Sequence, residues 1–232
     1  MARRRRKKQQ EAEETLVDLV EVRDSASDFF EDNQKTILGV LTGLVLLIGG
    51  YLAYTQFVKA PKEAKAMEAL TQAQNQFEQD SFALAISNPG GGFEGFADIV
   101  QNYGGTKAAN AATYYAGVSH LHLGQYDAAI DYLEDFSASG TILEYTKYGA
   151  LGDAYAEKND FASAISNYQK AANSGDNEVL ASYYLKKLGL LYEKQGQLNE
   201  AKAAFEKIRE KFPSSQEGAD IEKYISRVLA KG

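Results

Sequence analysis

The chain contains no cysteine and no tryptophan, and it has only two histidines, His120 and His122. Without cysteine, disulfide bonds and thiolate metal sites are excluded, although the compartment stays open because such a chain fits either side of a membrane. Two histidines spaced two residues apart on a helix point to different faces, so they cannot easily chelate one metal ion together. No serine–histidine–acid order suggests a catalytic triad, and the many carboxylates fit solvated helix faces. The sequence therefore predicts a non-catalytic protein with no cofactor and no metal ion.

Charge is unevenly placed along the chain. Between Glu78 and Glu144 there are nine acidic residues, and Lys107 is the only lysine or arginine. An acidic domain repels phosphates, so nucleic acid is not expected as a ligand. By contrast, Arg3 to Lys8 are six consecutive cations. They are expected either to attract anionic lipid headgroups or only to set the topology of the chain.

One long hydrophobic run interrupts this polar sequence at residues 36–58. It holds 23 uncharged residues between Lys35 and Lys59. At ~1.5 Å per residue a helix of this length measures ~34 Å, which is enough to cross a ~30 Å hydrocarbon core. The alternative, a cleaved signal peptide, normally has a shorter apolar region of about 7–15 residues. The run therefore predicts one transmembrane helix that acts as an uncleaved signal anchor.

Three glycines of this run, Gly39, Gly43 and Gly50, fall on nearly the same helix face. Such a face lets a second helix approach closely, so these residues are a candidate transmembrane packing site, although glycine is common in membrane helices. Pro61 predicts a break between the span and the next helix. The eight cations of the short arm before the span favour a cytoplasmic N terminus and a large domain outside.

The rest of the chain is patterned for helices, which predicts an all-α fold. We divide the chain into a basic arm with an amphipathic helix (1–35, its helical pattern over 11–34), the transmembrane helix (36–58), a degenerate first helical hairpin with a glycine-rich loop (59–105), three repeats (106–213) and a capping helix (214–232). Within the last of these, the pattern predicts one helix over residues 216–231. The glycine run after Pro89 is interpreted as a connection, because no Lys-Ser/Thr follows it as in a phosphate-binding loop.

Three sequence windows, beginning at Thr113, Tyr148 and Leu185, align without gaps. Each has a glycine in its first helix, a glycine or asparagine at the turn, an alanine in its second helix and a large apolar residue four positions later. These are Gly117, Gly124, Ala129 and Leu133; Gly152, Asn159, Ala164 and Tyr168; and Gly189, Gly196, Ala201 and Phe205. Antiparallel helices cross closely only where side chains are small, so we expect Gly152 to face Ala164. The pattern predicts an α-solenoid of stacked hairpins.

This pattern resembles the tetratricopeptide repeat, with Tyr155 and Tyr192 in the first helices and Pro213 closing the last repeat. The first window departs from it, with His120 where tyrosine is usual. The resemblance implies that peptides bind in a concave groove lined by the first helices. The groove residues it implies are Tyr114, Val118, Leu121, Asp153, Tyr183, Lys186 and Leu190. Repeats that clamp a C-terminal carboxylate have lysine and asparagine where this chain has Tyr114 and Val118, which argues against such a ligand.

A second resemblance covers most of residues 12–230. A short basic arm, one span and a repeat domain, with AKAMEALTQAQNQFEQDSF (64–82), GGTKAANAATYYAG (104–117) and FPSSQEG (212–218), look like the ancillary subunit family of the bacterial SecYEG translocon in its Bacteroidota form. The resemblance implies a single-pass inner-membrane protein with a periplasmic C-terminal domain. Its partners would be the SecYEG translocon, a membrane-anchored periplasmic prolyl-isomerase-like chaperone, exported client proteins and membrane lipid. The alternatives are a structural scaffold in another envelope secretion or motility complex and, if the topology is inverted, a cytosol-facing adaptor.

Overall fold

The computed structural model describes residue 29 and residues 31–232, so the basic arm and most of the amphipathic pattern over 11–34 lie outside the described residues. The described part consists of helices joined by turns and loops, with no strand, which confirms the predicted all-α fold. The chain divides into two compact units, Met1–Ala60 and Pro61–Gly232. Each unit is considered by itself.

The first unit contains the long hydrophobic run. It belongs to a helix, Glu31–Glu78, that is long and apolar enough to cross a membrane, and none of its most apolar window is buried. Large side chains are open along the run, with Leu47 at 74% and Phe57 at 78% exposed. Apart from its chain neighbours and the adjoining backbone of its own helix, no described atom lies within 4 Å of a Cβ built on Gly39, Gly43 or Gly50. The packing role of these glycines therefore stays a prediction.

The expected helix break at Pro61 is wrong. Residues Thr55–Lys59 form a π-helical turn, η1, and α2 (Ala60–Glu78) follows it directly with Pro61 inside its first turn. The Ala60 N–H bonds the carbonyl of Thr55, five residues earlier. Proline in a regular α-helix clashes with the carbonyl four residues before it, and a π turn is wider than an α turn. The wide turn just before Pro61 thus makes room for the ring, and the helix continues.

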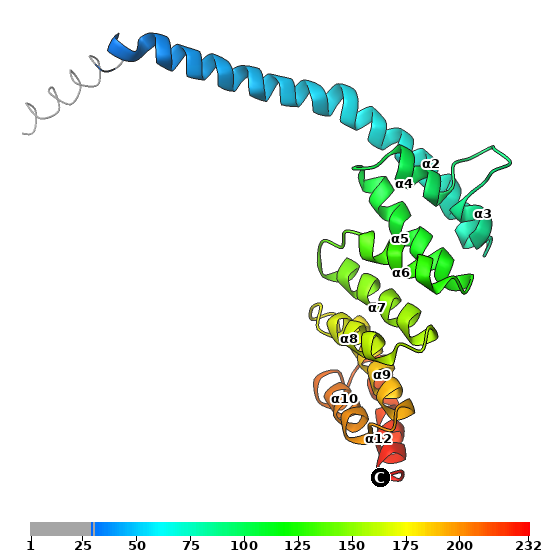
Figure 1. The fold of residues 1–232 in the computed structure, drawn as a ribbon. Helices are drawn as coiled ribbons and strands as arrows, with labels where there is room; N and C mark the ends of the chain where they lie inside the picture. The colour runs from blue at the N-terminus through cyan, green and yellow to red at the C-terminus, as the bar shows by residue number, and fades with distance from the viewer. Residues whose placement is uncertain (1–28, 30) are drawn as a thin grey trace, which may run out of the picture. The chain divides into compact units, whose positions relative to one another are not determined.

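The second unit is built of helical hairpins (Figure 1). After α2 come α3 (Phe82–Ile86), α4 (Phe96–Asn102), α5 (Lys107–His122), α6 (Tyr126–Asp135), α7 (Thr141–Glu157), α8 (Phe161–Ala172), α9 (Glu178–Lys194), α10 (Leu198–Lys211), α11 (Gln216–Ala219) and α12 (Ile221–Leu229). The pairs α5–α6, α7–α8 and α9–α10 pack as hairpins, and α6–α7 and α8–α9 join one hairpin to the next. The first helices also meet, α5 with α7 and α7 with α9, so together they form one side of the stack.

Glycines in the first helices admit large side chains from the second helices. A Cβ on Gly117 would lie 2.7 Å from Leu133, one on Gly152 2.5 Å from the Tyr168 ring, and one on Gly189 2.4 Å from the Phe205 ring. At Gly152 the three nearest atoms all belong to the Tyr168 ring, and the expectation that Gly152 faces Ala164 stays a prediction. The small residue is needed because the large one, sixteen positions later in each hairpin, fills the crossing point.

The helices before α5 form a small core of their own with it. Leu70 of α2 and Phe96 and Ile99 of α4 are buried there. The Phe77 ring meets the Tyr115 ring of α5 edge to face, with 5.2 Å between centroids. The short helix α3 was not expected from the sequence.

A carboxylate of α2 holds the start of α5. Glu63 accepts hydrogen bonds from the backbone N–H groups of Lys107 and Ala108, both at 2.9 Å, and the Thr106 hydroxyl oxygen accepts one from Ala109 at 3.0 Å. The N–H groups at a helix start have no partner within the helix. Glu63 and Thr106 therefore satisfy the first N–H groups of α5 between them.

Replacing Glu63 with alanine is expected to lower the free energy of unfolding by about 1 kcal/mol, the usual cost of losing a helix cap. Urea denaturation of the full chain in detergent micelles, followed by circular dichroism, measures this change. Glu68→Ala is the matched control on the same helix, because Glu68 is exposed. Equal unfolding midpoints for the two variants would show that Glu63 does not act as a cap.

The single helix expected over 216–231 is divided at Asp220. The first piece, α11, packs against α9 as well as α10, and α12 packs against α10, so the break lets α11 reach the first helix of the last hairpin. The Glu193 side chain, only 7% exposed, accepts hydrogen bonds from Arg227 at 2.8 and 2.5 Å and from Lys231 at 2.7 Å. Bonding to Arg227, together with Lys231, lowers the pKa of Glu193. These charges fix the terminal helix to the last hairpin.

Candidate functional site

A hollow of about 690 Å³ opens on the side formed by the first helices, and we call it the inner groove. Most of its lining comes from α5, α7 and α9. The lining residues are Tyr114, Val118, Leu121, His122, Tyr126, Thr146, Ala150, Asp153, Ala156, Glu157, Tyr168, Tyr184 and Lys187. The α7 residues Thr146, Ala150, Asp153 and Glu157 are spaced by four, three and four positions, which places them on one helix face.

The centre of the inner groove is an internal ion pair. Lys187 of α9 donates to both carboxylate oxygens of Asp153, at 2.6 and 2.8 Å, and the Tyr168 hydroxyl donates to the same carboxylate at 2.5 Å. Burial works against the charge of Lys187, but the Asp153 carboxylate raises the pKa of Lys187 above its usual value. Burial and then Asp153 raise the pKa values of Tyr168 and Tyr184. At neutral pH the groove therefore holds one satisfied ion pair beside neutral phenols.

Aromatic rings extend the surface on both sides of this ion pair. The Tyr114 centroid lies 5.7 Å from that of Tyr115 and 5.3 Å from that of Phe136. On α9, the Tyr183 ring meets the Tyr184 ring edge to face at 5.1 Å. The lining thus offers tyrosine faces for apolar contact and hydroxyl groups for hydrogen bonds.

The structure brings four of the seven expected groove residues together, namely Tyr114, Val118, Leu121 and Asp153. Tyr183 and Leu190 lie on α9 outside this lining and are 41% and 37% exposed. That any of these residues contacts a ligand stays a prediction.

Lys186, the last of the seven, also lies outside this lining. Its ammonium group pairs with Glu217 of α11 and lies 5.0 Å from the centre of the Tyr224 ring of α12. Lys186 therefore holds the terminal helices rather than the groove. Its neighbour Lys187 takes the place in the groove, because adjacent residues on a helix point ~100° apart.

Sequence reasoning also missed Tyr168, Tyr184 and Lys187. A signal for Lys187 was available, since it lies 37 positions after Ala150, on the helix face that Asp153 shares. Neither histidine joins a metal cluster: His122 stacks on Phe82 with ring centroids 4.3 Å apart, and His120 Nδ1 lies 2.6 Å from Gln125 Oε1. Among the described residues no group of three or more possible ligands could hold a metal ion.

A larger space of about 1070 Å³, which we call the apolar hollow, adjoins the inner groove. It lies where α4, α5 and α6 meet the start of α7, and Val100, Phe136 and Leu143 are among its lining residues. Tyr114 and Thr146 line both spaces. The inner groove and the apolar hollow therefore meet at these two side chains.

Comparison with known families agrees with this geometry. Three tetratricopeptide-repeat family models match the chain, at residues 96–139, 148–174 and 186–215. No curated protein matches it. The matched residues cover α4–α6, parts of α7–α8 and most of α9–α10. The chain thus carries tetratricopeptide repeats, which form a protein–protein interaction module.

Proposed function

We propose that this protein is a non-catalytic, membrane-anchored adaptor of the SecYEG translocon that holds extended segments of exported proteins on the periplasmic side. The observation that carries the proposal is the inner groove. Its ion pair is already satisfied, so it demands no particular charge from a ligand. Its tyrosines offer rigid contact area at low entropic cost together with hydrogen-bonding hydroxyls. Such a surface suits many unfolded segments rather than one sequence.

The hydrophobic helix supports the second half of the proposal. In our view residues 36–58 span the inner membrane once, with the basic arm in the cytoplasm, following the positive-inside rule. Anchoring raises the local concentration of the groove beside the export channel, so weak binding of each segment is enough. A membrane-anchored prolyl-isomerase-like chaperone at the same channel would receive the segments or bind the repeat domain directly.

One observation favours the alternative of a scaffold in another envelope secretion or motility complex. Ile142 and Val179 stand at equivalent positions at the starts of α7 and α9, and they are 59% and 69% exposed. Apolar side chains repeated on one edge are typical of a fixed interface with another subunit. A scaffold would use this edge constantly, whereas a client-binding adaptor would use the inner groove transiently.

Photo-crosslinking from positions 114 and 183 of the full chain in native membranes tests the adaptor proposal. We expect position 114 to label exported chains and translocon subunits, with labelling of exported chains lost when export is stopped. Lys202, an α10 residue outside the linings described above, provides the control position, from which little labelling is expected. A single adduct that does not depend on export would favour the scaffold. Labelling of neither exported chains nor translocon subunits would contradict the adaptor.

A further inference from the structure

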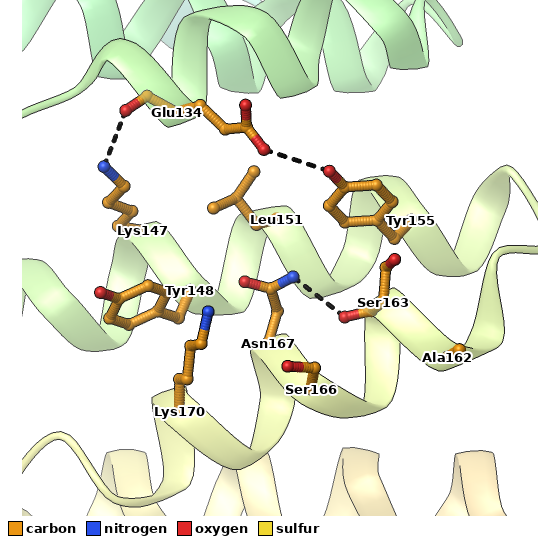
Figure 2. Close-up of a pocket in the computed structure, with 10 residues that line it drawn as sticks. All are labelled: Glu134, Lys147, Tyr148, Leu151, Tyr155, Ala162, Ser163, Ser166, Asn167 and Lys170. Carbon is orange, nitrogen blue, oxygen red and sulfur yellow. Dashed lines mark hydrogen bonds between the residues drawn. The ribbon is translucent and has the colours of Figure 1, made fainter.

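A second hollow, of about 490 Å³, lies on the other side of α7, and we call it the outer notch (Figure 2). It is formed by α6, α7 and α8. Its lining residues are Glu134, Lys147, Tyr148, Leu151, Tyr155, Ala162, Ser163, Ser166, Asn167 and Lys170. The α7 residues in this list alternate with those of the inner groove. At ~100° per residue the two sets face opposite sides of the helix, so the inner groove does not account for the outer notch.

Several polar groups of the outer notch already have structural partners. The Lys147 ammonium donates to the backbone carbonyls of Glu134 and Phe136, at 2.9 and 2.6 Å, and so closes the end of α6. The Tyr155 hydroxyl donates to the Glu134 carboxylate at 3.1 Å. These contacts hold the walls of the notch together.

Asn167 differs, because its acceptor is open. The residue is 8% exposed, and its Nδ2 donates to the Ser163 carbonyl at 2.9 Å. This bond identifies the other atom as Oδ1, since a carbonyl oxygen cannot donate. Oδ1 has no hydrogen bond from any described residue and faces the notch (Figure 2). No described side-chain nitrogen or oxygen is both enclosed and without a partner, so Oδ1 is reached by solvent, and a donor of a ligand can replace the water there.

A free cation stands on the same face of α8, one turn further on. No described carboxylate lies within 4.0 Å of the Lys170 ammonium, which sits 5.4 Å from the centre of the Tyr148 ring. Ser166 is exposed beside it. The outer notch therefore presents an acceptor, a hydroxyl and a cation on one face.

The next hairpin contains an equivalent notch in which Ser166 and Asn167 have no polar counterpart. It lies between α8, α9 and α10 and measures about 360 Å³. At 37 positions after Ser166 and Asn167 stand Ala203 and Ala204, and the equivalent lysine, Lys207, donates to Asn173 Oδ1 at 3.1 Å. The hairpin α9–α10 therefore packs without a buried amide side chain at this position. The fold alone does not explain Asn167.

We propose that the outer notch binds an extended acidic peptide segment of a partner protein. A backbone N–H of the segment donates to Asn167 Oδ1, and an adjacent Asp or Glu carboxylate pairs with the Lys170 ammonium and accepts from the Ser166 hydroxyl. The stem of the acidic side chain packs on Tyr148 and Leu151. A small anion lacks the donor and would meet the lone pairs of Oδ1, and a basic segment is repelled by Lys170. Only a ligand that carries a donor and an anion together matches the site.

Fluorescence anisotropy of the full chain in lipid nanodiscs tests this proposal with a labelled peptide of alternating glutamate and valine. We expect saturable binding that Lys170→Gln weakens about tenfold, the usual effect of losing a charge-assisted hydrogen bond. Asn167→Ala, which installs the residue of the equivalent notch, is expected to weaken binding about fivefold. Lys207→Gln is the matched control and should leave binding unchanged.

Charge reversal supplies an independent check that does not depend on the Asn167 variant folding. Lys170→Glu at an exposed position should shift the preference to a peptide of alternating lysine and valine, with an unchanged helical circular dichroism spectrum. Absence of saturable binding, equal binding of a glutamine–valine peptide, or equal weakening by Lys207→Gln would each overturn the proposal. Crosslinking from position 114 probes the inner groove, on the opposite side of α7. Its outcome is therefore independent of whether a peptide binds in the outer notch.

Discussion

Adding one methyl group at Gly189 is expected to lower the free energy of unfolding by about 1–3 kcal/mol, the usual cost of overpacking a core. A Cβ there would lie 2.4, 2.7 and 2.8 Å from three carbons of the Phe205 ring. The ring is fully buried and packs against the Tyr224 ring, with centroids 5.5 Å apart. It therefore has little room to move away. Urea denaturation of the Gly189→Ala chain in detergent micelles measures the loss.

A matched control and a rescue distinguish overpacking from a general effect of alanine. Gly104→Ala places a Cβ 3.5 Å from the nearest atom, which is ordinary contact, so little loss is expected there. Phe205→Leu replaces the ring with a smaller side chain, so Gly189→Ala should cost less stability in that background. The double variant should therefore lose less stability than the sum of the two single losses. Strict additivity would contradict the proposed close contact.

Raising the pH above about 10 is expected to destabilise the repeat domain through the inner groove. The pKa values of Tyr168 and Tyr184 are raised in the folded chain, while in the unfolded chain tyrosine ionises near pH ~10. Above that pH the unfolded state loses protons that the folded state keeps. Each tyrosine then removes about 1.4 kcal/mol of stability per pH unit until it ionises in the folded state.

Lys187 acts in the same direction. Its pKa is raised in the folded state by Asp153, although burial opposes its charge, so its contribution is complete below the unfolded value of ~10.4 and is lost as the pH rises through the folded value. Urea midpoints at about pH 8 and about pH 11, with tyrosinate absorbance recorded in parallel, measure the combined effect. Tyr168→Phe removes one titrating group, so the stability of this variant should fall less steeply. Equal slopes for both chains would contradict the assignment.

The hairpins could be predicted because their residue types follow from close helix crossing. Glycine or asparagine marks the turns, where Gly124, Asn159 and Gly196 have positive φ angles of 72°, 61° and 72°. The spacing of the small and large residues then fixes the register within each hairpin. By contrast, α3, the break at Asp220 and the π turn before Pro61 depend on which helices pack together or on local strain. No periodic pattern in the sequence indicates which helices pack together or where the backbone is strained.

The inner groove could be predicted only in part, for a geometric reason. The first and second windows are 35 positions apart and the second and third are 37 apart, so the two extra residues leave the rotation of α9 open. Lys187, and not its neighbour Lys186, meets Asp153. The outer notch was not predicted at all. Asn167 and Lys170 match no motif, and only the structure reveals the open acceptor.

The position of α7 between the inner groove and the outer notch has a practical meaning for protein engineering. From residue 144 to residue 156 no side chain of this helix is fully exposed, because one side lines the inner groove and the other packs on the hairpins or lines the outer notch. Most helices on a protein surface keep a stripe where substitutions are silent, and α7 has none over this stretch. Libraries aimed at changing ligand preference are therefore better placed on Tyr183 and Leu190 of α9, whose side chains reach solvent. Random changes along α7 would mostly report on folding.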